Sequence, residues 1–335
     1  MKRFAALALA AALAAGLAGC GGSGTLKSMD WAIEPAYEFE AVEPVADTGL
    51  MTPWTVSTRA GEAGYYLAKT AGGWAVLNAL TGDTASAGAF LNRPTGCGDG
   101  HLYDPESPSW QWEDPAKYDQ FNAELKAIGT SYRLEVGHGG SSVIFLADEA
   151  GTITATASSD MGTDHPELSS LKDLPGLVPV RQGRAVPTDD GWDEIIIERD
   201  DLFAVASSDG RLLTDFVYED ACMATDEAVA VCKEGKWGYV DAEGKEIVPC
   251  EYEAFWGKKQ QKNEAAGEFE WVEGVWPAPF TEGCVVVKQN GQTGVLNADG
   301  SWLLKMGEVE DAAPAFGGLL WVKTEGKWGA LKLPA

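Results

Sequence analysis

The sequence predicts an all-β protein made of repeated β-hairpin units, each with three to four strands. Short apolar runs recur along the chain, and polar turns that contain glycine separate them. Tryptophan and glycine are abundant, with 13 and 40 residues, and a Trp-Gly pair follows several of these turns. Long stretches of helical periodicity are nearly absent, which argues against a mainly helical fold.

The clearest unit lies between Lys233 and Tyr252. It reads Lys-Glu-Gly-Lys-Trp-Gly-Tyr-Val-Asp-Ala-Glu-Gly-Lys-Glu-Ile-Val-Pro-Cys-Glu-Tyr. This alternation of short apolar runs and Gly-containing turns predicts a tight hairpin with one more strand attached. Fainter copies occupy other parts of the chain, including residues 61–82 around Trp74, 195–204, 282–294 and 317–329.

The spacing of the copies locates the insertions. Phe203, Trp237, Thr293 and Trp328 occupy corresponding positions, which are 34, 56 and 35 residues apart. The long step indicates an insertion at residues 256–275. A second insertion is expected near residues 90–140, where the repeats blur.

Within that second region the sequence predicts one helix. Asp114 is a suitable N-cap, and Pro115 suits the first helical position. One apolar face follows, formed by Tyr118, Phe121, Leu125 and Ile128. Further on, residues 143–151 are predicted to form another hairpin.

The repeat unit resembles the WG repeat of bacterial proteins, which is roughly Gly-Lys-Trp-Gly-Tyr-Ile-Asp, a turn, and Ile-x-Pro-x-Tyr-Asp. Residues 236–241 and 247–252 match both halves, and residues 327–329 match the first half. The resemblance is convincing over residues 195–333. It implies a repeat scaffold and supplies no catalytic motif.

The two ends of the repeat region complement each other. The last unit stops after residues 329–333, without a third strand, whereas residues 31–41 contain Ile33-Glu-Pro35 and Tyr37-Glu. We therefore expect the N-terminal segment to complete the C-terminal unit. Such closure removes exposed sheet edges and favours a closed β-propeller-like ring of about six or seven blades. An open β-solenoid is the alternative.

The first residues predict where the protein is located in the cell, not a part of its folded domain. Lys2 and Arg3 precede an Ala/Leu-rich run that ends in Leu17-Ala-Gly-Cys20. This pattern is typical of a signal peptide, here residues 1–19, and it resembles the bacterial lipobox. The resemblance implies diacylglycerol on Cys20, a tether at residues 20–30, and a repeat domain at residues 31–335. The expected location is the extracytoplasmic face of a bacterial membrane.

The net charge and the cysteine content limit which binding partners and which disulfides the protein is expected to have. The formal net charge of −26 repels phosphate backbones, so nucleic acid is not expected as a partner. An exported location permits disulfides among the four cysteines of the repeat region, and buried free thiols are the alternative. These cysteines are Cys222, Cys232, Cys250 and Cys284. The sequence predicts neither a metal site nor a cofactor.

The repeat tryptophans are expected to be structural, because a Trp at the same point of every unit packs between neighbouring sheets. The following glycine permits a close backbone approach. This interpretation covers Trp74, Trp237, Gly238, Trp328 and Gly329. Paired acids after the second turn, such as Glu219-Asp220 and Glu310-Asp311, recur once per unit and fit turn capping better than catalysis.

Aromatic residues in the two insertions are the candidates for ligand contact. They are Trp110, Trp112, Trp256, Trp271 and Trp276. Aromatic side chains on loops over a rigid scaffold suit sugar stacking or protein anchoring. The alternative is that they fold back and cover the scaffold.

Together these features predict a lipid-anchored scaffold that binds a protein or a cell-envelope ligand. One alternative is a glycan-processing hydrolase whose carboxylates gather at one face of the ring. Another is a purely structural envelope protein.

Overall fold

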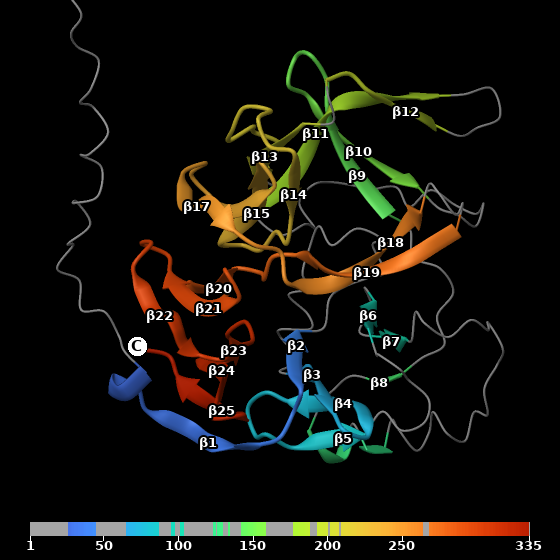
Figure 1. The fold of residues 1–335 in the computed structure, drawn as a ribbon. Coiled ribbons are helices and arrows are strands. Elements are labelled where there is room, and N and C mark those ends of the chain that lie inside the picture. The colour runs from blue at the N-terminus through green and yellow to red at the C-terminus, as the bar shows by residue number, and fades with distance from the viewer. Residues whose placement is uncertain are drawn as a thin grey trace, which may run out of the picture.

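The computed structural model describes residues 26–44, 65–86, 95–97, 101–103, 123–124, 126–129, 133–134, 142–158, 177–187, 193–199, 202–207, 209–263 and 268–334. These residues form several small sheets that are mostly antiparallel (Figure 1). The predicted all-β class is thus confirmed. No helix within the described ranges has the length and apolar character needed to cross a bilayer.

The clearest predicted unit forms one four-stranded antiparallel sheet. Its strands are β14 (Asp220–Cys222), β15 (Ala228–Lys233), β16 (Lys236–Asp241) and β17 (Glu246–Tyr252), in that spatial order. The turn between β15 and β16 places Glu234 and Gly235 at φ of 53° and 68°. Two consecutive positive φ values are typical of the tight turns that match strand twist. The local turn sequence therefore produces the predicted hairpin.

The next two units repeat this pattern. Strands β20 (Cys284–Gln289), β21 (Gln292–Asn297) and β22 (Trp302–Val309) form one sheet. Strands β23 (Asp311–Ala312), β24 (Leu319–Thr324) and β25 (Lys327–Lys332) belong to the following one. The faint copy around Trp74 forms β3 (Tyr65–Thr70) and β4 (Gly73–Asn78), flanked by β2 (Ala41–Pro44) and β5 (Thr84–Ser86).

The N-terminal segment completes the C-terminal unit, as predicted. Strand β1 (Trp31–Tyr37) pairs antiparallel with β25, with Trp31 opposite Leu331 and Tyr37 opposite Trp328. The chain then continues into β2, which belongs to the sheet of β3 and β4. One short segment therefore contributes a strand to the last unit and a strand to the first.

The repeat copy predicted at residues 195–204 does not form the hairpin that the sequence suggests. Strand β13 (Phe203–Ser207) pairs with residues 177–181 of β11 (Leu177–Pro187), not with residues 195–197. Residues 195–197 lie in β12 (Asp193–Ile197), which pairs with residues 183–187 of the same long strand. The prediction was wrong because the apolar run at residues 195–197 extends a hairpin instead of opening the unit.

The hairpin predicted at residues 143–151 is present as β9 (Ser142–Ala147) and β10 (Ile153–Ser158). Strands β6 (Thr95–Cys97), β7 (His101–Tyr103) and β8 (Arg133–Leu134) form a small sheet in the other predicted insertion.

Most of the predicted helix, including its start at Asp114, lies outside the described residues. The described part shows a single helical turn, in which the Ile128 N–H donates to the Glu124 carbonyl at 3.2 Å. Gly129 follows at a φ of 85°. Besides this turn, the described chain contains a short 3-10 helix, η1 (Leu26–Ser28), and no α-helical element.

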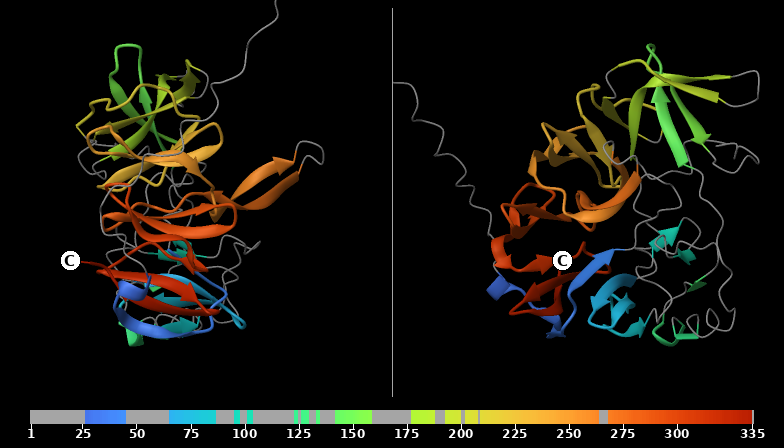
Figure 2. Two further views of the ribbon diagram at one scale, coloured as in Figure 1. Left: turned by 60° about the vertical axis from the view of Figure 1, so that its left-hand side comes forward. Right: turned by 45° about the vertical axis from the view of Figure 1, so that its right-hand side comes forward.

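The insertion predicted at residues 256–275 forms a two-stranded ribbon, here called the arm. It consists of β18 (Trp256–Asn263) and β19 (Glu268–Trp276), which pair only with each other among the described strands. Figure 2 (left) shows the arm projecting away from the stacked sheets.

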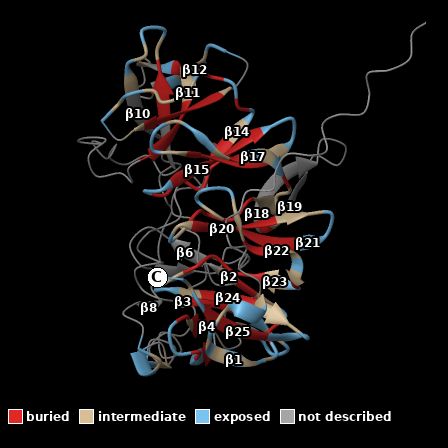
Figure 3. Cartoon of the chain, turned by 90° about the vertical axis from the view of Figure 1, so that its left-hand side faces the viewer, coloured by how far each residue is buried: buried red, intermediate tan, exposed pale blue. Residues whose placement is uncertain are grey.

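Apolar clusters join successive repeat sheets. One cluster joins the sheets of β14–β17, β20–β22 and β23–β25, and a second joins the β23–β25 sheet to that of β2–β5. A third joins β11 and β13 to β14–β17. The described sheets consequently follow one another along an arc (Figure 2, right), with buried strands and exposed turns (Figure 3).

Candidate functional site

The repeat tryptophans and the glycines that follow two of them lie where strands and sheets pack together. Trp237 is 5 % exposed and Trp328 is fully buried, whereas Trp74 is half-buried. A Cβ at Gly238 would lie 2.4 Å from the Val248 carbonyl oxygen. A Cβ at Gly329 would lie 2.7 Å from the Ile33 carbonyl oxygen. The Gly of each pair thus allows the neighbouring strand to approach closely at a point where the register of the two strands shifts, in the last unit as in the internal one.

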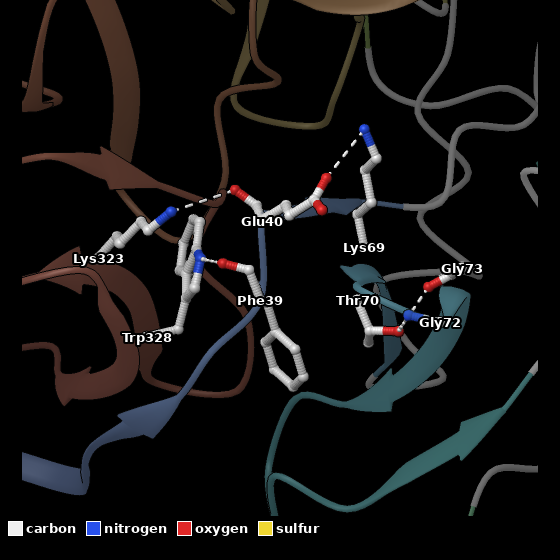
Figure 4. Close-up of polar contacts among 8 residues, drawn as sticks. All are labelled: Phe39, Glu40, Lys69, Thr70, Gly72, Gly73, Lys323 and Trp328. Atoms are coloured by element: carbon white, nitrogen blue, oxygen red, sulfur yellow. Dashed lines mark hydrogen bonds and ion pairs between the residues drawn. The ribbon is translucent and has the colours of Figure 1, made fainter.

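The contact between the last and first units is polar as well as apolar (Figure 4). The Trp328 indole Nε1–H donates to the Phe39 carbonyl at 3.1 Å, and both residues are buried. The Trp321 indole Nε1–H donates to the Ala79 carbonyl at 2.8 Å. The Tyr66 hydroxyl donates to the Pro314 carbonyl. These bonds satisfy polar groups that burial would otherwise leave at a cost of about 1–3 kcal/mol each.

Glu40 links the two units at their surface. Its carboxylate lies 3.1 Å from Lys69 Nζ, and its carbonyl accepts from Lys323 Nζ at 3.3 Å (Figure 4). Its own N–H donates to the Lys69 carbonyl at 2.7 Å. The turn that follows Lys69 is held by Thr70, whose hydroxyl accepts from the Gly72 N–H and donates to the Gly73 carbonyl.

A glutamate that follows the second turn in successive repeats caps the repeat hairpin turn that comes next along the chain. The Glu219 carboxylate accepts from the N–H groups of Glu234 and Gly235, at 3.1 and 3.0 Å. Glu253 accepts from the Asn290 N–H at 3.2 Å, and Glu310 accepts from the Gly326 N–H at 3.0 Å. The predicted capping role of these acids is therefore confirmed.

A second set of carboxylates joins the loops that precede the hairpins. Glu227 accepts from the Gly283 N–H at 2.7 Å, and Glu282 accepts from the N–H groups of Gly317 and Gly318. Sequence reasoning did not anticipate that these bonds cross from unit to unit. The available signal was the small or acidic residue that starts each unit.

The four described cysteines of the repeat region form no disulfide, which agrees with the alternative of reduced thiols. Cys232 packs in the cluster that contains Trp237, whereas Cys250 packs against the cluster on the other face of the sheet. Cys222 lies opposite Ala230, two residues from Cys232 along β15, and Cys284 lies in another sheet. Burial raises the pKa of the Cys232 and Cys284 thiols to about 12, which suits inert core residues.

The aromatic candidates divide between the core and the arm. Trp256 is 6 % exposed and Trp276 is half-buried, with their ring centroids 6.3 Å apart at the base of the arm. Trp256 therefore follows the alternative interpretation, in which the aromatics cover the scaffold. Trp271 pairs with Gln260 farther along the arm. Trp110 and Trp112 lie outside the described residues.

A small cavity lies beside the base of the arm, between β2, β20 and β23. Its volume is about 50 Å³, which accommodates a few water molecules rather than a large ligand. At its wall, Lys288 Nζ lies 2.8 Å from an Asp311 carboxylate oxygen and 4.7 Å from the Phe255 ring centroid. The lysine and the aspartate thus neutralise each other.

Comparison with known proteins identifies the repeat. The chain matches the family described as WG containing repeat over residues 237–257 and 294–328. A search of curated proteins found no match. The first stretch covers β16 and β17, and the second runs from β21 into β25. The chain therefore carries WG repeats, in which the Trp side chains are buried and the Gly residues permit a close approach of the paired strand.

Proposed function

We propose that this protein is a membrane-anchored, extracytoplasmic lipoprotein whose WG repeats form a scaffold that binds a protein or cell-envelope ligand through the arm. In this proposal residues 1–19 are a signal peptide, Cys20 carries diacylglycerol, and residues 20–30 are the tether. The basic start, the apolar run and the Leu-Ala-Gly-Cys pattern support this assignment. Residues 1–25 lie outside the described residues.

The scaffold is proposed to close into a propeller-like ring. The pairing of β1 with β25 supports closure, because it places the N-terminal segment on the last unit. The apolar cluster and indole hydrogen bonds between the last and first units support it further. Closure would make the scaffold rigid, and a rigid body is a good platform for a binding element.

The arm carries the binding proposal. It is a two-stranded ribbon outside the repeat sheets, and such a ribbon has marginal stability alone in water. Its base is fixed by the Trp256–Trp276 contact and by the hydrogen bond from the Phe255 N–H to the Trp276 carbonyl. Its outer part contains Phe269 and Trp271, residue types that are enriched at binding hot spots or stack well on ligands.

The hydrolase alternative gains no support from the described acids. The carboxylates of Glu219 and Glu310 accept hydrogen bonds from turn backbone, and that of Asp311 pairs with Lys288. A general acid needs free carboxyl oxygens within reach of the substrate, whereas these carboxylates are engaged in structural hydrogen bonds and an ion pair.

The test is an affinity capture from detergent-solubilised envelope with three soluble baits, all carrying Cys20→Ser. One is otherwise unchanged, one carries Trp271→Ala, and the control carries Val217→Ala. Val217 is 43 % exposed in the connection between β13 and β14, so the control removes an exposed apolar side chain outside the arm. The proposal expects a ligand that the unchanged and control baits retain and that the Trp271→Ala bait loses. Its identity is then checked by direct binding with purified components. Equal capture by all three baits would place binding elsewhere.

A further inference from the structure

The segment of residues 26–44, called the clasp, holds the last and first units together. Its strand β1 pairs with β25, and its strand β2 pairs with β3 from Ala41–Lys69 to Pro44–Tyr66. The Lys332 N–H also donates to the Asp30 carbonyl at 2.9 Å. Within the described ranges, non-covalent contacts hold the clasp to the two sheets.

The clasp is only partly buried. Residues of β1 alternate between half-buried and exposed, and none of the seven is fully buried. Phe39 and Val42 are its buried side chains, with 8 % and 5 % exposure. By contrast, β24 and β25 contribute fully buried residues such as Trp321 and Trp328. Segments with little buried apolar surface open at lower free energy than the core.

The two units keep direct contacts that do not involve the clasp. The Trp321 indole donates to the Ala79 carbonyl, and the Tyr66 hydroxyl donates to the Pro314 carbonyl. These bonds join the sheet of β23–β25 to that of β2–β5 without any clasp residue. Release of the clasp therefore does not require the units to separate.

The chain length after the clasp allows it to reach another molecule. Residues 45–64 separate β2 from β3, and twenty residues span at most about 70 Å when extended. In a second copy the accepting strands are identical, so every contact of the clasp can be repeated there. Exchange of an identical element between copies is a low-cost route to a dimer.

We propose that residues 26–44 are an exchangeable clasp, and that a second copy of this chain can supply it to the β25 and β3 strands. Exchange leaves the rest of each copy folded. It joins two copies through one strand segment each, and in a tethered protein it would join neighbours on one membrane surface.

The test uses the soluble full chain with a protease site within residues 45–64, cut after folding. Unlabelled and ¹⁵N-labelled samples are mixed, and native mass spectrometry follows hybrids that combine one clasp with the other body. Hybrids are expected to form faster than the cut protein unfolds, as measured by denaturant jumps on the same sample. If hybrids form no faster than the protein unfolds globally, the clasp does not open independently and the proposal is overturned.

A matched pair of glycine variants assigns the exchange to the β1–β25 contact. Gly329→Ala places a Cβ against the Ile33 carbonyl and Pro35, so exchange should accelerate by at least about tenfold, or about 1.4 kcal/mol. Gly238→Ala creates the same clash at an internal unit, where β17 is continuous with its sheet, so exchange relative to global unfolding should not rise. If both variants accelerate exchange equally, the β1–β25 contact does not control it. If Gly329→Ala does not fold, the comparison of the exchange rate with the global unfolding rate in the parent protein tests the proposal by itself.

Uncut chains test whether a second copy of the chain supplies the clasp. Concentrated full-length protein should contain a dimer, and mixed isotopes should yield mixed dimers at the rate of clasp release. A chain that stays monomeric at its highest soluble concentration, while its cut clasps exchange, would overturn the supply of the clasp by a second copy.

Discussion

Replacing Gly238 by alanine tests whether the WG glycine is required for space rather than for backbone freedom. The added Cβ would lie 2.4 Å from the Val248 oxygen and 2.7 Å from the Cys250 nitrogen, both backbone atoms of β17. Strand β17 must then move away from β16. Overpacking of this kind costs about 1–3 kcal/mol, and a displaced ladder hydrogen bond adds about 1 kcal/mol. We expect a loss of about 3 kcal/mol in the free energy of unfolding.

Gly235→Ala is the matched control in the same hairpin. Gly235 has a φ of 68°, and a Cβ there meets nothing within 4 Å. Its replacement should therefore cost only the left-handed conformation of alanine, about 1–2 kcal/mol. Urea unfolding followed by tryptophan fluorescence gives both values. A loss at Gly238 no greater than that at Gly235 would refute the argument that the close approach of β17 requires this glycine.

Three further outcomes are expected. Glu219→Gln should weaken the cap on the Glu234-Gly235 turn and speed amide hydrogen exchange there. The expected stability loss is about 1 kcal/mol, because the site is exposed. Unchanged amide exchange at this turn would show that Glu219 does not cap it. Burial raises the pKa of Cys284 to about 12, so its neutral thiol stabilises the fold below the unfolded pKa near 9, and this contribution declines as pH rises from about 9 to about 12. This contribution is measured by unfolding the parent protein and Cys284→Ala at a series of alkaline pH values. Identical dependence of stability on pH in the two proteins would contradict the prediction. Cys20→Ser should move the protein from the membrane to the soluble fraction and remove the lipid mass; continued membrane retention would argue against a lipid anchor at Cys20.

Local features of the sequence predicted the hairpins correctly. The Glu234-Gly235 turn and the apolar runs around it contain the information for β15 and β16, because a tight turn fixes its two flanking strands. The same holds for residues 31–37, whose Ile-x-Pro pattern marks a third strand even though its partner β25 lies at the other end of the chain.

Pairing across insertions could not be predicted in the same way. Strand β13 pairs with Leu177–Arg181 because β11 is long enough to serve two partners, β13 and β12, in succession. The apolar run of β12 has the composition of a repeat strand. Its place depends on the length of β11, which residue pattern alone does not encode.

The candidate binding residues show the same division. The sequence identified the insertion at residues 256–275 from the repeat spacing, and its tryptophans from their residue type. It could not separate Trp256, which is buried at the base, from Trp271 farther along β19, because strand register decides which residues reach the core.

The sequence by itself predicted the all-β class, the repeat unit and the capping role of the acids after each second turn, and it favoured a structural role for the Trp-Gly residues. These follow from short-range chemistry: turn residues, strand alternation and the size of a glycine. Tertiary structure alone decided that the Glu227 and Glu282 carboxylates bind backbone N–H groups of the next sheet, that the four cysteines form no disulfide with one another, and that the arm stands outside the sheets. Those outcomes depend on how units stack in space, and stacking is set by packing between residues far apart in the chain.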